Sequence, residues 1–388
     1  MLRVATIAGI TAQHAEEAAF LWLRRRDAID GHLLDETGIG RIDQRLEANI
    51  EGLEVAGLAG WTLAKERFAD YEEPGETFVV GVLALRSGSP EAVAEALELA
   101  GPLGEGGIAA LSGAIARTPR ENLRPFVADW INSRKPMLRS LGLASLWHHR
   151  VDAGPKLGEC LDDPDASVRI RALKLAGRLK QRQHMPAVQA ALGREDAGER
   201  LEAAVASCLL GDLKAARPVL DRLVLTVPEL ARRAMEMRLL TTPAAEAKRW
   251  LQTRLEQPLS RVDAVASIGL LGDTAIMPWL IEKMRDPELA VAAGEALRDL
   301  FAVDFDDTDA FTSDPASLGP AFADREETEL PAADQVAAWW KERAAATQPG
   351  TPYQSMRRQR LDAYRAALRE PELLLANWRR TRQYPAWM

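Results

Sequence analysis

The sequence predicts an all-α fold, a right-handed superhelix of stacked helix pairs, because three features recur with a period of about 31 residues. Two segments that begin with Asp-Pro, at Asp163 and Asp286, each open a run rich in Ala and Leu. They lie about four periods apart. The tripeptide Leu-Gly-Asp begins at Leu210 and again at Leu271, two periods later. One helix pair of this length cannot bury its apolar face alone, so we expect the pairs to stack into a solenoid.

Prolines provide the third recurring feature, because each stands before a helical apolar pattern, where the first turn of a helix tolerates proline. The prolines that follow the period are Pro90, Pro119, Pro155, Pro186, Pro218, Pro243 and Pro278. Ser89, Thr118 and Thr242 precede three of them as candidate capping residues. Thr118 and Glu121 also have the spacing of a capping box. Helices are therefore expected to begin at these positions.

Residues 1–75 are predicted to form a helical N-terminal cap. Apolar periodicity indicates one helix over residues 14–29 and a second over residues 41–61. Their pattern does not follow the repeat, and terminal units of a solenoid must present a polar outer face. A divergent cap is the expected solution.

Residues 76–303 are predicted to hold a HEAT-like array of about seven units, each of two helices joined by a turn. The stretch from Phe78 to Leu85 is the one β-like run, and we interpret it as a buried helix. Small alanines on the helices permit close contact between neighbouring units.

The composition changes after the array. Residues 304–334 hold ten acidic residues and a single basic residue, Arg325, and are predicted to be a solvated acidic linker. Residues 335–388 are predicted to form C-terminal helices and a basic, aromatic tail. Acidic linker and basic tail could pair with each other or with different partners.

The overall composition excludes several classes of protein. The 388 residues are 47% hydrophobic with a net charge of −8, which excludes collagen-like and disordered chains and disfavours nucleic-acid binding. Cys160 and Cys208 provide neither a disulfide framework nor a zinc site. No apolar run reaches the roughly 18 residues of a membrane helix. We therefore expect a cytoplasmic protein without membrane contact.

The repeat pattern resembles HEAT-type repeats. The resemblance rests on the Asp-Pro turn, the pair Val168-Arg169, the Ala-rich first helix and the Leu-Gly-Asp turn. The two ends, at residues 14–23, 43–61, 336–340 and 358–360, resemble a bacterial family of uncharacterised HEAT-repeat proteins. Genes of that family often accompany type VI secretion components and effectors. The resemblance implies a role beside that machine, with an effector or an apparatus component as partner, and it supplies no catalytic residues.

Motifs that carry chemistry do not stand out. His148 and His149 are adjacent and point about 100° apart on a helix, so we interpret them as exposed imidazoles in an inter-helix turn rather than metal ligands. The acidic run from Asp304 to Asp309 lacks the glycine of a calcium loop. No catalytic residue, cofactor or metal is predicted. The sequence favours a non-enzymatic protein-binding scaffold. An enzyme on a HEAT-like scaffold (a lyase or DNA glycosylase) is the alternative, and a phosphate sensor that uses arginine clusters is a third.

Partner contacts are expected on the concave surface, which the second helices of the repeats are predicted to line, and at the C-terminal end. The candidates are polar, basic or aromatic residues that could anchor a partner. They are Arg124, Trp130, Lys156, Arg222, Arg249, Trp250, Trp279, Lys283, Trp339, Trp340, Arg379, Arg380 and Trp387. Trp130, Trp250 and Trp279 have a second interpretation, as core residues, and Trp339 and Trp340 have one as residues that pack against the last repeat.

Overall fold

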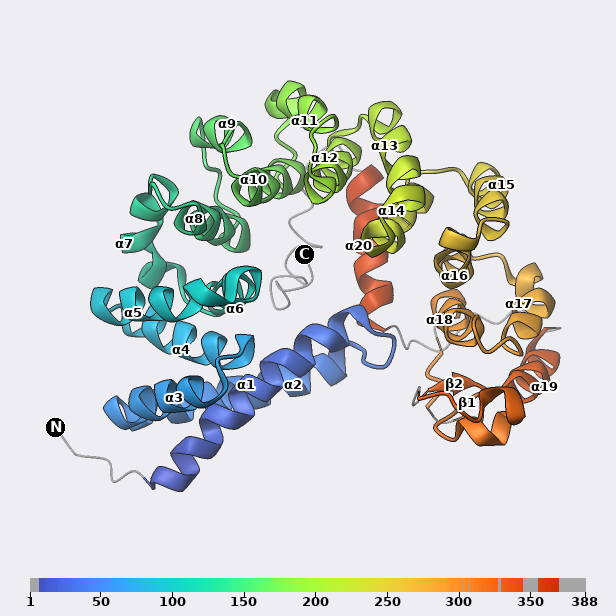
Figure 1. The fold of residues 1–388 in the computed structure, drawn as a ribbon, viewed down its shortest axis with the longest axis horizontal. Coiled ribbons are helices and arrows are strands. Elements are labelled where there is room, and N and C mark those ends of the chain that lie inside the picture. Colours follow the sequence, from blue (N-terminus) through green and yellow to red (C-terminus); the bar gives the residue numbers. More distant parts are fainter. Residues whose placement is uncertain (1–6, 302, 307, 327–328, 345–354, 370–388) are drawn as a thin grey trace. The chain divides into compact units, whose positions relative to one another are not determined.

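The structure, a computed structural model, describes residues 7–301, 303–306, 308–326, 329–344 and 355–369. Within these ranges, helices joined by short connections pack in a repeat-like array, which confirms the predicted all-α solenoid (Figure 1). Contacts divide the chain into two compact units. The described part of the first unit ends at Val188, and the second unit is Gln189–Arg369.

The first unit has two layers of helices. Its elements are α1 (Ala8–Asp30), α2 (Glu36–Ala56), α3 (Leu58–Tyr71), α4 (Pro74–Ser87), α5 (Pro90–Ala100), η1 (Gly101–Leu103), α6 (Gly104–Ala116), α7 (Arg120–Ile131), α8 (Pro136–His149), α9 (Lys156–Leu161), α10 (Ala166–Arg178) and η2 (Arg182–His184). Helices α4, α6, α8 and α10 form one layer, since each packs against the next. Helices α5, α7 and α9 each pack against a member of that layer.

Helix α4 is the most deeply buried element of the first unit. Every residue from Gly75 to Leu85 is buried, so the β-like run that we interpreted as a helix is one. The ring of Phe78 stacks on Trp22 of α1, with centroids 5.0 Å apart. The predicted helix over residues 41–61 is in fact two helices, because the chain turns at Gly57 with φ of +57°.

A network of buried charge joins α1 and α2 to the end of α6. The Arg25 side chain is only 2% exposed, and its Nε donates to Asp43 of α2 at 2.6 Å. Asp43 also accepts a hydrogen bond from Arg117, which follows α6. Arg86 of α4 donates to the backbone carbonyl of Arg117 at 2.8 Å and pairs with Glu47 at 2.6 Å. The N-terminal helices are thereby tied to the repeats.

The second unit repeats the layered pattern. Its elements are α12 (Ala197–Leu210), α13 (Leu213–Thr226), α14 (Pro228–Leu240), α15 (Ala244–Leu255), α16 (Pro258–Ser267), η3 (Ile268–Leu271), η4 (Thr274–Ile276), α17 (Met277–Lys283), α18 (Ala290–Leu300), β1 (Phe311–Thr312), η5 (Pro315–Leu318), η6 (Pro320–Phe322), β2 (Leu330–Pro331), α19 (Ala333–Arg343) and α20 (Met356–Arg369). The short α11 (Met185–Ala191) crosses the boundary between the units. Helices α12, α14, α16 and α18 pack in succession, and α13, α15 and α17 pack against them.

The acidic segment at residues 304–334 differs from the expected solvated linker. Its strands β1 and β2 pair antiparallel, and β2 packs against α18. Phe305, Phe322 and Leu330 are at most 4% exposed. The carboxylates give the segment its polar composition, while the apolar side chains between them are buried in a small core. For this reason the average composition of the segment did not predict that it is folded.

An arginine recurs at the fourth position of four helices, at intervals of about one or two repeat periods. The four are Arg139 of α8, Arg169 of α10, Arg200 of α12 and Arg261 of α16. Each donates to a backbone carbonyl six residues earlier, at or just after the end of the preceding helix, at distances of 2.7–3.2 Å. A cation at that end satisfies orphan carbonyls and opposes the helix dipole. This arginine is therefore a structural feature of the repeat.

The predicted caps have mixed outcomes. The Ser89 hydroxyl accepts from the backbone N–H of Ala92 and caps α5, as expected. Thr118 and Thr242 instead donate to carbonyls of the helices that precede them, and neither caps the helix that follows. The capping box at Thr118 is therefore wrong, because Pro119 and Pro243 occupy the N-cap positions.

The expectation of exposed imidazoles at His148 and His149 is wrong as well. Both residues end α8 and are half-buried. The Nε2 of His148 lies 3.0 Å from the Ser112 hydroxyl. Burial lowers the pKa of His148 well below its ordinary value, and Arg171 and His149 add to the effect.

Acidification is expected to destabilise the first unit through His148. The folded chain holds this imidazole neutral, whereas the unfolded chain binds a proton there below about pH 6.5. Unfolding therefore takes up a proton, and its free energy falls as the pH drops below that value. The substitution His148→Gln, which keeps a hydrogen-bonding partner for Ser112, should weaken this loss in urea titrations at about pH 7.5 and pH 5.5. An unchanged pH dependence, matching that of a His184→Gln control, would contradict the assignment.

Candidate protein-binding surfaces

A groove of about 780 Å³ lies on the first unit between α7, the end of α8 and the start of α9. We call it the α7–α9 groove. Apolar side chains form much of its lining, namely Leu123, Val127, Ala128, Ile131, Leu146, Val151 and Ala153. The polar side chains that line it are Arg120, Glu121, Arg124, Asn132, Ser145, His149, Asp152 and Lys156. The groove thus combines an apolar lining with charged groups from three elements.

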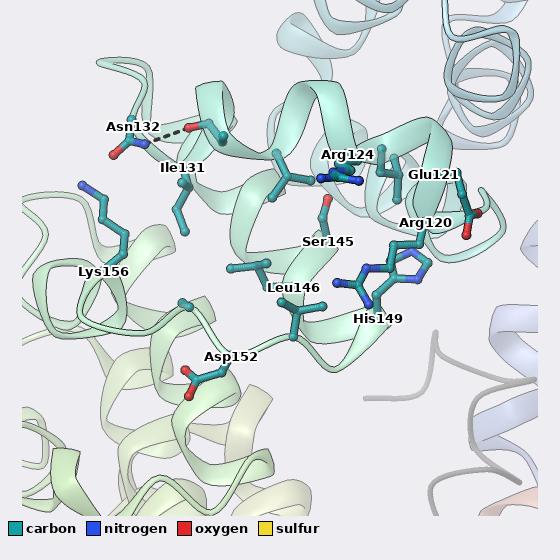
Figure 2. Close-up of a pocket in the computed structure, with 15 residues that line it drawn as sticks. Arg120, Glu121, Arg124, Ile131, Asn132, Ser145, Leu146, His149, Asp152 and Lys156 are labelled. Atoms are coloured by element: carbon teal, nitrogen blue, oxygen red, sulfur yellow. Dashed lines mark hydrogen bonds between the residues drawn. The ribbon is translucent and has the colours of Figure 1, made fainter.

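Figure 2 shows how the polar groups are distributed. Arg120 and His149 lie toward one end of the α7–α9 groove, and Asn132 and Lys156 toward the other. Arg124 lies between the two ends, from the middle of α7. The Asn132 amide donates to the Ala128 carbonyl at 2.8 Å, so it closes the last turn of α7.

Arg120, Arg124 and Glu121 are exposed charged groups of the groove, whereas Asp152 and Lys156 have partners. Asp152 accepts from Gln181 at 2.5 Å and from the backbone N–H of Gly154 at 2.8 Å. Lys156 pairs with Glu159 at 2.6 Å. Arg120 and Arg124 are exposed and, within the described ranges, neither forms an ion pair. Two arginines beside an apolar lining can receive carboxylates of a bound segment.

The structure brings together two of the residues that the sequence singled out on this unit. Arg124 and Lys156 line the same groove although they belong to α7 and α9. Trp130 is 5% exposed and stacks against Phe126, so it belongs to the core rather than to a contact surface. Its second interpretation, as a core residue, fits the structure.

The candidates on the second unit lie on the second helices of the repeats. Arg222 is on α13, Arg249 and Trp250 are on α15, and Trp279 and Lys283 are on α17. Arg222 and Arg249 are exposed. Trp250 is half-buried, with the guanidinium groups of Arg238 and Arg254 about 5.2 and 5.6 Å from its ring centroid. These residues do not converge on a single pocket of the described chain.

The other layer of the second unit is formed by α12, α14, α16 and α18. Helix α20 lies beside α12 and α14 and also contacts η3 and the end of α18 (Figure 1). We call the surface that α20 covers the α20-binding face. This face belongs to the first helices of the predicted pairs, whereas the partner contacts were expected on the second helices. A helix of the chain itself therefore covers a surface other than the one predicted to bind a partner.

The remaining candidates lie near the C-terminal end. Trp339 is 8% exposed, and its ring lies 5.1 Å from Phe301 and 5.2 Å from Phe305. Trp340 also contacts Phe301, at 5.6 Å. Both tryptophans pack against the end of the array. Arg379, Arg380 and Trp387 lie outside the described residues.

The α20 contacts were missed at the sequence level, although a signal was present. Arg357, Leu361, Tyr364 and Leu368 are spaced by four, three and four residues, which places them on one helix face. That spacing predicts an amphipathic helix, but it does not say where the helix docks. The surface it covers is assembled from residues that are almost a hundred positions apart in the chain, from Glu202 to Asp299.

No group of three or more potential metal ligands occurs among the residues that the structure describes. None of the described helices is long and apolar enough to cross a membrane.

Comparison with known proteins identifies the repeats. A search of curated proteins returns no match. Residues 154–239, from the turn before α9 into α14, match the family model for HEAT repeats. HEAT repeats stack into extended surfaces that generally serve protein–protein contact. The match therefore indicates a protein-interaction scaffold.

Proposed function

We propose that this chain is a non-enzymatic, cytoplasmic protein-binding scaffold that serves a type VI secretion effector as an adaptor, chaperone or immunity-like partner. The HEAT match supports the scaffold. The resemblance of residues 14–23 and 336–340 to bacterial proteins encoded beside that machine supports the identity of the partner. HEAT scaffolds are typically non-enzymatic, and no observation favours the lyase or glycosylase alternative.

The α7–α9 groove is the observation that carries the proposal. Its apolar lining offers area for burial, and Arg120 and Arg124 flank that lining without ion-pair partners in the described chain. A partner segment that presents apolar and acidic side chains together fits both features. Burial of the apolar side chains provides affinity, while the arginines steer the approach and set the register.

Charge reversal in the groove tests this function. The double substitution Arg120→Glu/Arg124→Glu should reduce effector recovery at least tenfold when the tagged chain is purified from its native host. Repulsion of the acidic segment by roughly 1.4 kcal/mol or more corresponds to that factor. Quantitative mass spectrometry of the co-purified proteins measures the change.

The control variant has the same net charge as the test variant and carries its substitutions in the same unit, but outside the groove. Arg134→Glu/Arg182→Glu makes the same charge change at two exposed arginines of the first unit that do not line the groove. Recovery with this control should match the unaltered chain. Equal losses in both variants would show a non-specific charge effect. Absence of any secretion effector from the unaltered sample would contradict the assigned partner.

A further inference from the structure

Three buried carboxylates, from α12, α14 and α18, belong to the α20-binding face. Glu202 and Asp299 are 4% and 0% exposed, and Glu236 is 8% exposed. Burial raises the pKa of Asp263 above its ordinary value; Arg232 opposes that rise, and Glu295 and Glu236 add to it. From the layer itself, Arg232 pairs with Glu236 at 3.3 Å and with Glu295 at 3.0 Å, and Arg233 pairs with Glu202 at 2.5 Å. Arg232 and Arg233 are the cations that the layer itself pairs with these carboxylates, and further cations come from outside the layer.

Helix α20 supplies those cations. Arg357 is 5% exposed, pairs with Glu236, and approaches Asp299 at 3.4 Å. Burial alone would lower the pKa of Arg357, but Glu236 and Asp299 outweigh it and raise the pKa. Arg358 donates to the Asp299 carbonyl, and Arg365 donates to the Leu270 carbonyl at 2.8 Å. The polar contacts therefore extend along α20 from its first turn to its third.

Apolar contacts complete the fit. Leu361 is 2% exposed and belongs to the core of the second unit, and Tyr364 and Leu368 pack against the same core. Ser355 caps the helix, because its hydroxyl accepts from the backbone N–H of Arg358 at 3.2 Å. The face thus recognises one arginine at the start of a helix and an apolar stripe four, seven and eleven residues further on.

We propose that the α20-binding face is a receptor site for an arginine-bearing amphipathic helix of a partner protein, and that α20 is the resident occupant which such a helix replaces. The buried carboxylates set the chemistry, since a helix without the arginine would take a buried ion-pair partner away from both Glu236 and Asp299. The inference rests on the proposed scaffold function but concerns a different surface from the α7–α9 groove, so each can fail alone.

A labelled peptide of residues 355–369 is the probe. In the full-length chain, the double substitution Arg357→Ala/Leu361→Ala weakens the docking of α20. Every residue of the α20-binding face is kept. The peptide should bind this variant at least tenfold more tightly than it binds the unaltered chain, as measured by fluorescence anisotropy. Adding Glu236→Gln/Asp299→Asn to the variant should abolish the gain, because these isosteric changes remove only the charges.

A charge-matched peptide separates recognition from general attraction. Arg357→Lys in the peptide keeps its net charge but loses the planar fork that reaches both carboxylates, so its affinity should fall at least fivefold. Equal binding of the two peptides, or equal binding to the variant and the unaltered chain, would overturn the proposal. Should circular dichroism show that the weakened variant is unfolded, a protease site placed within residues 345–354 provides a second route. After cleavage the labelled peptide should enter the complex, and failure to enter would count against the site.

Discussion

Replacing Asp43 with alanine is expected to lower the free energy of unfolding of the first unit by about 3 kcal/mol or more. The substitution removes the carboxylate that the buried Arg25 and the end of α6 share through Arg117. A cation left in the interior without this carboxylate costs far more than the pair contributes when intact. Urea denaturation followed by tryptophan fluorescence measures the change, since Trp22 lies in the same helix as Arg25.

The control for Asp43 joins the same two helices at the surface. Glu17 of α1 pairs with Arg45 of α2 at 3.0 Å, and the two side chains are 34% and 65% exposed. Glu17→Ala should cost less than about 1 kcal/mol, because water already screens the pair. Similar losses in the two variants would show that burial of Arg25 does not set the size of the effect.

Gly269→Ala should destabilise the second unit by about 3 kcal/mol, the upper part of the range for overpacked cores. A Cβ at Gly269 would lie 2.2 Å from the Ala296 carbonyl oxygen and 2.9 Å from the Cβ of Asp299. Gly269 is where η3 and α18 lie in close contact, and the backbone atoms of Ala296 cannot move aside as the tip of a side chain can. The added methyl group must therefore push the two elements apart.

A second glycine of the same unit provides the comparison. An added Cβ at Gly193 would meet nothing closer than 3.8 Å. Gly193→Ala should leave stability within about 0.5 kcal/mol, or raise it slightly through the unfolded chain. Thermal unfolding of both variants by circular dichroism measures the difference, and equal midpoints would contradict the close crossing at Gly269.

Local periodicity predicted the helices well because a repeat presents the same pattern to the same neighbours many times. The buried helix at residues 78–85 followed from its length and position. The break at Gly57 was missed because the apolar spacing continues across it, from Leu53 to Leu58, while the backbone reverses. Periodicity records which side chains are apolar, and it does not record where the chain changes direction.

Turn geometry and contacts between distant residues account for the features that the sequence did not predict. The pair Val168-Arg169 was recognised as a feature of the repeat, but the hydrogen bond from Arg169 to the Asp163 carbonyl depends on a turn geometry that composition does not encode. The meeting of Arg124 with Lys156 and the docking of α20 are likewise products of stacking. Trp130 and Trp339 had two interpretations, and burial favours the core for both.

The position of α20 in the chain affects how strongly a competitor must bind. Ten residues, 345–354, separate the end of the described α19 segment at Ala344 from Ser355. A ligand joined by so short a connection acts at an effective concentration on the order of millimolar. A free helix of equal intrinsic affinity would have to reach that concentration to displace half of α20. Only a helix that binds much more tightly, or one delivered by a partner already held elsewhere on the chain, would replace α20 at cellular concentrations.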